Sequence, residues 1–340
     1  MQNTQNFHPP KLLVARATFP AVLDKLGAHF DVQANQEDVI YTRTELLDKL
    51  QGCVAACTGG SERIDAELLS ACPDLKIVAN VAVGYNNFDV DACTAVGVLC
   101  TNTPDVLTET TADMAFALLM ATARRVSESE AFLRRGEWKK FKFDLLCGSD
   151  VHGSTLGILG MGRIGQEIAR RGALGFGMNV IYHNRSRLSA VDEAPLKARY
   201  VSKQELFAQA DHVVLVLPYS PAVHHTVGAT ELALMKPTAT LVNIGRGGLI
   251  DENALADALE KTPGRGTLMG AGLDVFEGEP TVNPRLLAQK NVVLTPHIGS
   301  ATVPTRLAMA NLAADNLIAF VCGQRPPTPI NPQVLTVDTT

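Results

Sequence analysis

The chain has 340 residues, more than a single hydrophobic core usually accommodates, so we expect two domains. Hydrophobic residues make up 46% of the sequence and charged residues 19%, which excludes an intrinsically disordered chain. The net charge of −5 provides no basic field for nucleic acid, and no apolar run is long enough to span a membrane.

The seven cysteines and the N-terminal residues bear on the cellular compartment. The cysteine count is odd and the spacing fits no disulfide framework, which is typical of reduced thiols in a cytoplasmic protein. Cys53 and Cys57 flank an apolar run, so we expect them in the core rather than at a metal ion. The polar N-terminal stretch lacks the apolar core of a signal peptide, in keeping with a cytoplasmic location.

Strand patterns alternate with helix patterns in the first hundred residues. Expected strands cover 11–15, 30–32, 53–57, 76–81 and 98–100, and expected helices cover 20–26, 45–50, 64–72 and 89–95. This alternation predicts a parallel sheet that is covered by helices on both faces.

The alternation resumes after two further helices, expected at 111–125 and 127–135. Expected strands cover 154–159, 178–182, 212–217, 240–244, 268–275 and 291–295, and the last expected helix covers 304–321. The residues expected to cap helices along the chain are Thr44, Ser202, Thr230 and Asp251. The tail after Gly323 is rich in proline and is expected to be extended.

A glycine motif opens the second half of the chain. Residues 160–165 read GMGRIG, a G-x-G-x-x-G between an expected strand and an expected helix, with a second strand after them. This strand–turn–helix–strand unit is the one that binds a dinucleotide. Gly160 permits the tight turn, Gly162 lets the pyrophosphate approach the backbone, and Gly165 lets the helix pack closely.

The residues after the second strand indicate which dinucleotide binds. An NAD site usually carries an acid there for the ribose 2′-hydroxyl, but this chain has Asn184, followed by Arg185, Ser186 and Arg187. Guanidinium groups suit bidentate phosphate recognition, and a serine adds a donor. We therefore predict NADPH in preference to NADH, with Arg185, Ser186 and Arg187 around the 2′-phosphate. The alternative is a solvated basic loop.

Polar residues follow three strands of the second half, at the carboxyl ends where open parallel sheets bind ligands. Arg246 follows one strand, Glu277 and Glu279 follow the next, and His297 follows the last. Hydride transfer to a keto acid needs a guanidinium for the carboxylate, a protonated histidine for the carbonyl oxygen, and a carboxylate that keeps the histidine oriented and protonated. Taken singly, each residue could instead be a surface ion-pair partner or a structural group.

The adjacent residues His224 and His225 resemble a metal-binding pair. Adjacent side chains do not face the same way on a helix or strand, so we interpret this pair as part of a loop. No metal site is predicted in the chain.

These motifs together resemble the D-2-hydroxyacid dehydrogenase family, and most closely its NADPH-dependent glyoxylate/hydroxypyruvate reductase branch, which includes 2-ketogluconate reductases. The likeness runs over nearly the whole chain. It rests on the segments 81–87, 156–170, 217–218, 243–247, 272–276, 279–280 and 295–300.

The resemblance implies roles for individual residues. The catalytic triad falls on Arg246, Glu279 and His297, because Glu279 and not Glu277 directly precedes the proline of the motif. The backbone at Val83 and Gly84, with Arg246, is expected to bind the substrate carboxylate. Asp274 matches a residue that binds the nicotinamide amide. The complete set of expected cofactor-binding residues is Gly160, Gly162, Arg163, Ile164, Asn184, Arg185, Ser186, Arg187, Pro218 and Asp274.

The resemblance also implies an architecture. We expect an α/β protein of two doubly wound parallel-sheet domains, Rossmann- or flavodoxin-like, with an active-site cleft between them. The substrate-binding domain would be discontinuous, 1–107 plus 298–340, and the dinucleotide-binding domain would cover 108–297. Family members are usually homodimers through about 108–150, and Trp138 or Phe141 from this segment is expected to help shape the partner's substrate pocket.

The predicted function is the NADPH-dependent reduction of hydroxypyruvate, glyoxylate or 2-ketogluconate to the D-2-hydroxy acid, with His297 as general acid. These substrates differ by groups that change binding by only about 1–3 kcal/mol, so the sequence leaves them unranked. One alternative is a nucleotide-sensing protein on the same fold, like the dehydrogenase-like corepressors. Those proteins carry long disordered extensions, which the short polar ends of this sequence do not match. An NAD-linked dehydrogenase working in the oxidising direction is the other, and the absence of an acid at Asn184 argues against it.

Overall fold

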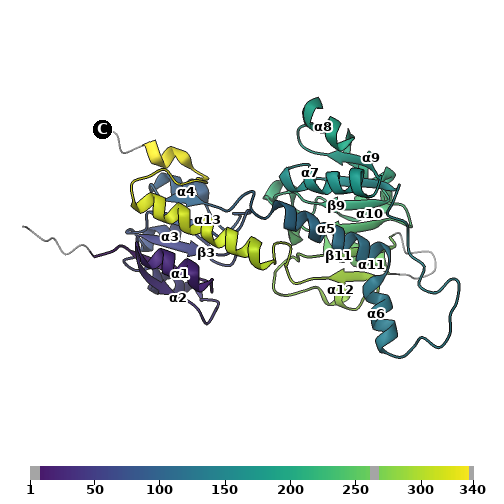
Figure 1. Cartoon of the computed structure of the whole chain (residues 1–340), viewed down its shortest axis with the longest axis horizontal. Coiled ribbons are helices and arrows are strands. Elements are labelled where there is room, and N and C mark those ends of the chain that lie inside the picture. The colour runs from purple at the N-terminus through teal and green to yellow at the C-terminus, as the bar shows by residue number, and fades with distance from the viewer. Residues whose placement is uncertain (1–7, 261–267, 337–340) are drawn as a thin grey trace, which may run out of the picture. The chain divides into compact units, whose positions relative to one another are not determined.

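Two parallel β-sheets organise the chain, each flanked by helices (Figure 1). The structure is a computed structural model that describes residues 8–260 and 268–336. All strand pairs within the two sheets are parallel, and each sheet carries a separate hydrophobic core on each of its faces. The predicted class, an α/β protein with two doubly wound parallel sheets, is confirmed.

The first sheet has five strands in the order β2-β1-β3-β4-β5. The strands are β1 (Lys11–Val14), β2 (Asp31–Ala34), β3 (Ala55–Thr58), β4 (Ile77–Asn80) and β5 (Leu99–Thr101). Its helices are α1 (Pro20–Gly27), α2 (Arg43–Leu50), α3 (Ala66–Ala71), α4 (Val90–Ala95) and α13 (Val303–Val321), followed by the short 3₁₀ helix η4 (Pro332–Thr336). Helix α13 comes from the far end of the sequence and packs against β4 and α1.

The second sheet has seven strands in the order β12-β11-β10-β9-β6-β7-β8. The strands are β6 (Thr155–Leu159), β7 (Asn179–His183), β8 (Arg199–Tyr200), β9 (His212–Leu215), β10 (Thr240–Asn243), β11 (Gly270–Leu273) and β12 (Val292–Leu294). Strands β9, β10 and β11 are buried along their whole length, which explains their nearly continuous apolar sequences.

The helices around the second sheet differ in length and type. The α-helices are α5 (Thr108–Ala123), α6 (Val126–Arg134), α7 (Arg163–Arg170), α8 (Ala190–Leu196), α9 (Lys203–Gln209), α10 (Ala229–Leu234), α11 (Glu252–Leu259) and α12 (Pro284–Leu287). A π-helical turn, η1 (Arg171–Gly175), continues α7, and short 3₁₀ turns occupy η2 (Pro221–Val223) and η3 (Gly247–Leu249). Helix α5 packs on β10 and β11. None of the described helices is both long enough and apolar enough to cross a membrane.

Several helix starts follow the expected capping residues, and others do not. Ser202 and Asp251 cap α9 and α11 with their side chains, as predicted. Thr42, not Thr44, caps α2, because its hydroxyl and Glu45 form a reciprocal capping box. Helix α10 begins after Gly228 instead of at Thr230.

Other differences from the sequence prediction also have local causes. The helix expected at 64–72 begins only at Ala66, because Ile64 forms a parallel bridge with Phe88. The tail expected to be extended contains η4. Helix α8 was not predicted, although Ser189 caps it, since Pro195 inside it disguises the helical pattern.

By its internal contacts the chain divides into one unit of 1–107 with 302–340 and another of 108–301. The second junction therefore falls after Ala301 and not after His297. The reason is that the backbone N–H groups of Ile298 and Gly299 are hydrogen-bonded to Asp274, which belongs to the unit with the second sheet.

Candidate active site

The glycine turn between β6 and α7 has the geometry of a phosphate-binding loop. Gly160 has φ = +109°, a conformation that side chains disfavour, and its N–H donates to the His183 carbonyl at 3.0 Å. A Cβ atom on Gly165 would lie 2.1 Å from the Gly160 carbonyl oxygen, so only glycine lets the helix approach. A Cβ on Gly162 would meet no atom within 4 Å. Gly162 therefore faces open space at the start of α7, where a pyrophosphate fits.

Asn184, predicted to contact the cofactor, holds the glycine turn in place. Its side-chain oxygen accepts the Met161 N–H at 2.6 Å, and its carbonyl accepts the Tyr200 hydroxyl at 3.1 Å. Asn184 thus occupies the position expected for an acid and uses its amide oxygen to fix the loop.

Arg187 is already paired with an acid that the sequence analysis did not identify. Its Nε and Nη2 atoms donate to the two carboxylate oxygens of Glu193 at 2.8 and 2.7 Å, and the Tyr182 hydroxyl donates to the same carboxylate at 2.6 Å. The bonds from Arg187 and Tyr182 lower the pKa of Glu193 to about 2, and burial with the bond to Glu193 raises the pKa of Tyr182 to about 12. That Arg187 lies around the 2′-phosphate with Arg185 and Ser186 stays a prediction.

Arg185 and Ser186 are exposed, and neither makes a hydrogen bond or ion pair with any residue in the described part of the chain. The guanidinium of Arg185 is thus available to an anionic ligand. Three other expected cofactor residues also lie beside the turn or the end of a neighbouring strand: Arg163 begins α7, Ile164 packs against the core beneath it, and Pro218 is exposed after β9.

His297 and Glu279 form a direct pair. The Nδ1 atom of His297 lies 2.8 Å from Oε2 of Glu279, and Oε1 of Glu279 accepts the Phe276 N–H at 2.9 Å. An anionic acceptor at Nδ1 places a proton on that nitrogen, so the Nε2 atom of His297 is directed away from Glu279. The imidazole is therefore held in one orientation, as a proton donor requires.

Arg246 lies within electrostatic range of Glu279. Burial raises the pKa of Glu279, but hydrogen bonds from His297 and the Phe276 N–H, with the charges of His297 and Arg246, bring it below its ordinary value. Burial lowers the pKa of Arg246, and Glu279 opposes this effect. The structure thus brings the three predicted triad residues together at the carboxyl ends of β10, β11 and β12.

Asp274 anchors the loop that carries His297. The residue is 1% exposed, its Oδ1 accepts the Thr295 hydroxyl at 2.7 Å and the Ile298 N–H at 2.8 Å, and its Oδ2 accepts the Gly299 N–H at 2.7 Å. His297 itself has φ = +53°, and its N–H donates to the Asp274 carbonyl at 2.9 Å. The sequence offered no signal for this anchoring role.

The loop after β4, in the unit with the first sheet, presents two backbone donors. The carbonyls of Val83 and Gly84 accept the side-chain amides of Asn102 and Asn80, each at 2.8 Å. The N–H groups of Val83 and Gly84 have no partner among the described residues. Free adjacent N–H groups are suited to an anion such as a carboxylate.

Comparison with known proteins agrees with this geometry. The family model described as "D-isomer specific 2-hydroxyacid dehydrogenase, NAD binding domain" matches residues 116–299. The chain is 48% identical over 332 residues to the glyoxylate reductase of Thermococcus gammatolerans, with 96% of this chain and 98% of the relative covered. It is 46% identical over 332 residues to the glyoxylate reductase of Pyrococcus furiosus, with 96% and 97% covered.

A solved structure shows the same fold. The NADPH-dependent glyoxylate/hydroxypyruvate reductase of Sinorhizobium meliloti, in complex with NADP and malonate, matches with a TM-score of 0.81 at 36% identity, covering 94% of this chain and 96% of that one. The sequence relatives and this fold agree with the resemblance inferred from the motifs. The chain therefore belongs to the D-isomer specific 2-hydroxyacid dehydrogenase family and is an NAD(P)-dependent oxidoreductase.

Proposed function

We propose that the protein reduces a small 2-keto acid, glyoxylate, hydroxypyruvate or 2-ketogluconate, to the D-2-hydroxy acid with NADPH. The observation that carries the proposal is the His297–Glu279 pair at 2.8 Å, with Arg246 in electrostatic range. The relatives named as glyoxylate reductases and the NADPH-dependent neighbour support it. Membership of an oxidoreductase family favours catalysis over the nucleotide-sensing alternative.

His297 acts as the general acid in this proposal. The nicotinamide supplies the hydride when bound. The Glu279 carboxylate stabilises the doubly protonated imidazole, and the Nε2–H of His297 donates to the oxygen of the keto group as negative charge develops there. Reduction consumes this proton.

The substrate carboxylate needs donors that stay charged or fixed. Arg246 provides a permanent cation, and its guanidinium donates to the Gly245 carbonyl at 2.7 Å, which limits its motion. We propose that Arg246 binds the carboxylate, which orients the keto carbon for hydride transfer.

The preference for NADPH rests mainly on Arg185. The exposed guanidinium has no partner among the described residues, and Ser186 beside it is a further donor. The glycine turn accommodates a dinucleotide, since Gly162 leaves space for the pyrophosphate. The loop does not use all the lone pairs of the Asp274 carboxylate. We propose that a remaining lone pair accepts a hydrogen bond from the nicotinamide amide.

Steady-state oxidation of NADPH and of NADH, each with glyoxylate, hydroxypyruvate and 2-ketogluconate as acceptor, tests the proposal. We expect turnover with at least one acceptor and a higher kcat/KM with NADPH. Replacing both Arg185 and Arg187 by alanine should raise the KM for NADPH far more than that for NADH. Turnover with none of these acceptors, by protein that still binds NADPH, would reject the proposed substrate class, and equal effects on both cofactors would reject the phosphate site.

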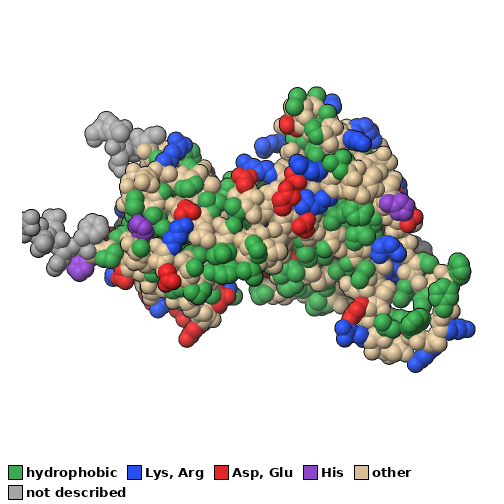
Figure 2. All heavy atoms as spheres, viewed as in Figure 1, with side chains coloured by type: hydrophobic (Ala, Val, Ile, Leu, Met, Phe, Trp, Pro, Cys, Tyr) green, Lys and Arg blue, Asp and Glu red, His purple; other side chains and the backbone are tan. Residues whose placement is uncertain are grey.

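A homodimer through about 108–150 is part of the proposal. Helix α6 and the segment after it expose Val126, Leu133, Trp138, Phe141 and Phe143, and Figure 2 shows hydrophobic side chains gathered there. Exposed apolar groups of this size favour a protein interface. Phe141→Ser should shift the mass measured by light scattering toward the monomer, whereas Val191→Ser, a control at an exposed valine on α8, should not.

Trp138 and Phe141 remain alternatives for the residue that reaches the partner's active site. To test this, each alanine variant is mixed with the His297→Asn protein so that the two exchange subunits. If the aromatic residue reaches the partner's active site, the exchange changes the measured activity. A cytoplasmic location completes the proposal, supported by free thiols at all seven cysteines.

A further inference from the structure

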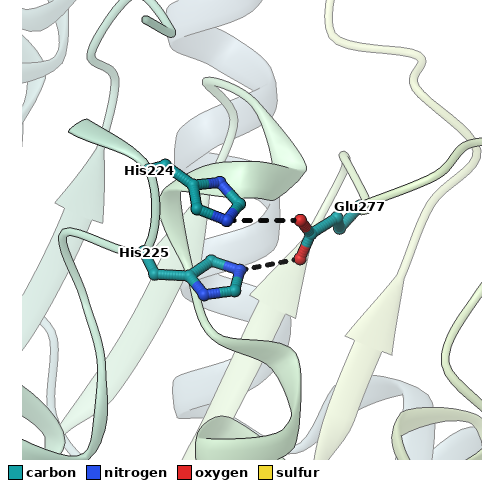
Figure 3. A group of neighbouring side chains, drawn as sticks. All are labelled: His224, His225 and Glu277. Atoms are coloured by element: carbon teal, nitrogen blue, oxygen red, sulfur yellow. Dashed lines mark hydrogen bonds and ion pairs between the residues drawn. The ribbon is translucent and has the colours of Figure 1, made fainter. Parts of the chain in front are cut away.

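Three side chains from two loops converge near the carboxyl ends of the second sheet (Figure 3). His224 and His225 follow η2, and Glu277 follows β11. The Nε2 atom of His225 lies 2.8 Å from Oε2 of Glu277, and the Nε2 atom of His224 lies 3.8 Å from Oε1 of the same carboxylate. One ligand atom from each of the three residues lies within 4.8 Å of the others.

The two histidines lie in a loop after η2, as the sequence analysis interpreted them, and the backbone at His225 sets the direction of the second ring. This residue has φ = +50°, in the left-handed region, and its N–H donates to the Gly248 carbonyl at 2.8 Å. The turn rotates the second imidazole to the side of the first, so that the rings stack with centroids 3.8 Å apart and planes 22° apart. Adjacent residues thus face the same way because they lie on neither a helix nor a strand.

We propose that His224, His225 and Glu277 bind a divalent transition-metal ion of the Zn²⁺ type. Imidazole nitrogens and a carboxylate oxygen are typical Zn²⁺ ligands, and bonds of about 2.0–2.2 Å in a tetrahedron separate neighbouring ligand atoms by about 3.3 Å. The two nitrogen–oxygen distances of 2.8 and 3.8 Å lie on either side of that value. Small side-chain movements would therefore lengthen the shorter of these distances and shorten the longer one. The fourth coordination position would be left to water.

Groups around the three residues suit a metal site. The Tyr219 hydroxyl lies 3.1 Å from Nδ1 of His224. A metal-bound imidazole keeps a proton on that nitrogen, and the hydroxyl oxygen can accept a hydrogen bond from this N–H group. A Cβ on Gly248 would lie 2.7 Å from the Tyr219 ring and 3.4 Å from His224 Nδ1, so glycine allows this packing. The Glu277 N–H donates to Glu252 at 2.8 Å, which fixes the backbone of the third ligand.

The proposed site is separate from the triad but joined to its backbone. Glu277 lies one residue after Phe276, whose N–H donates to Glu279 at 2.9 Å. A bound ion would tie the loop that carries His224 and His225 to this turn. The inference concerns binding and not turnover, so it stands or falls independently of the keto-acid chemistry.

Competition between the chelator-treated full-length protein and a fluorescent zinc indicator tests the site. We expect the wild type to bind one Zn²⁺ per chain tightly. Either His225→Gln or Glu277→Gln should weaken the Zn²⁺ affinity more than about tenfold, since losing a metal ligand costs more than losing a group hydrogen-bonded to a ligand. Co²⁺ should give the absorption bands of a four-coordinate site in the wild type and lose them in both variants. Circular dichroism verifies that the variants are folded.

Control variants separate this site from other possible zinc ligands. Cys147→Ser and Cys322→Ser remove the two exposed thiols, of which Cys322 lies 3.8 Å from a nitrogen of His29, and His297→Asn breaks the catalytic pair. All three should keep the wild-type Zn²⁺ affinity. Unchanged affinity in folded His225→Gln and Glu277→Gln, or no Zn²⁺ uptake by the wild type, would show that the cluster is an ion pair only.

Discussion

The Oδ2 atom of Asp274 accepts the Gly299 N–H at 2.7 Å, and this bond fastens the loop that carries His297 to the end of β11. The same carboxylate accepts the Thr295 hydroxyl and the Ile298 N–H. A residue expected to serve the cofactor thus positions His297, the proposed proton donor.

Asp274→Asn should destabilise the protein and lower its activity. An amide nitrogen in place of one oxygen leaves a buried donor without an acceptor, which costs about 1–3 kcal/mol. Urea unfolding measures the loss, and kcat measures the displacement of His297. Thr295→Val removes only a hydroxyl donor and should cost less. Equal stability of the two variants would contradict the anchoring role.

His297→Asn should lower kcat/KM for the keto acid by about 10²–10⁴-fold, the usual contribution of a general acid. Glu279→Gln should lower it as well, because the imidazole loses the carboxylate at Nδ1. NADPH binding, followed by its fluorescence, should remain intact in both variants. Asp24→Asn, at an exposed acid on α1, serves as the control. Near-normal turnover by His297→Asn would overturn the mechanism.

Two glycines of the same turn should respond differently to alanine. At Gly165 a Cβ would lie 2.1 Å from the Gly160 oxygen, so Gly165→Ala should lower the Tm. At Gly162 a Cβ meets open space, so Gly162→Ala should keep the Tm and weaken dinucleotide binding, because the methyl group occupies the approach of the pyrophosphate. Normal NADPH affinity in Gly162→Ala would place the phosphates elsewhere.

Arg185→Ala and Arg187→Ala should separate the two arginines. Arg185 is free of partners among the described residues, whereas Arg187 is held by Glu193 through two bonds. We expect Arg185→Ala to raise the KM for NADPH by about tenfold or more, the loss of a charge-assisted hydrogen bond, and Arg187→Ala to raise it less. KM values with both cofactors decide the point. A larger effect at Arg187 would mean that the ion pair opens for the phosphate.

The Glu193 carboxylate should make stability depend on pH. Its pKa of about 2 in the folded protein lies below the ordinary 4.5, so the stability it contributes is present above about pH 4.5 and is lost as pH falls toward 2. Thermal unfolding of the wild type and of Glu193→Gln should therefore differ most near neutral pH, with the gap closing across this window. A gap that stays constant with pH would show that the side chain contributes through packing alone.

Local sequence was enough for the class of the fold and for the type of site. Strand and helix patterns that alternate along the chain predicted both parallel sheets. A strand that is buried on both faces has a continuous apolar sequence, which makes it recognisable. The glycine turn could be read from its motif, although Gly160 is also constrained by a distant segment, since a Cβ there would lie 2.9 Å from the carbonyl carbon of Val216. The identities of Arg246, Glu279 and His297 came from short motifs at strand ends.

Side-chain pairs that follow no helix or strand period were decided only by the tertiary structure. Glu193 becomes the partner of Arg187 because α8 turns back beside β7, and the sequence pattern of α8 is broken by Pro195. His224 and His225 meet Glu277, which lies about fifty residues away, because one left-handed residue rotates the second ring. Backbone dihedrals at single loop residues and pairings across long stretches of chain carry no periodic signal, so the sequence determined the scaffold and the triad, and folding in three dimensions determined their partners.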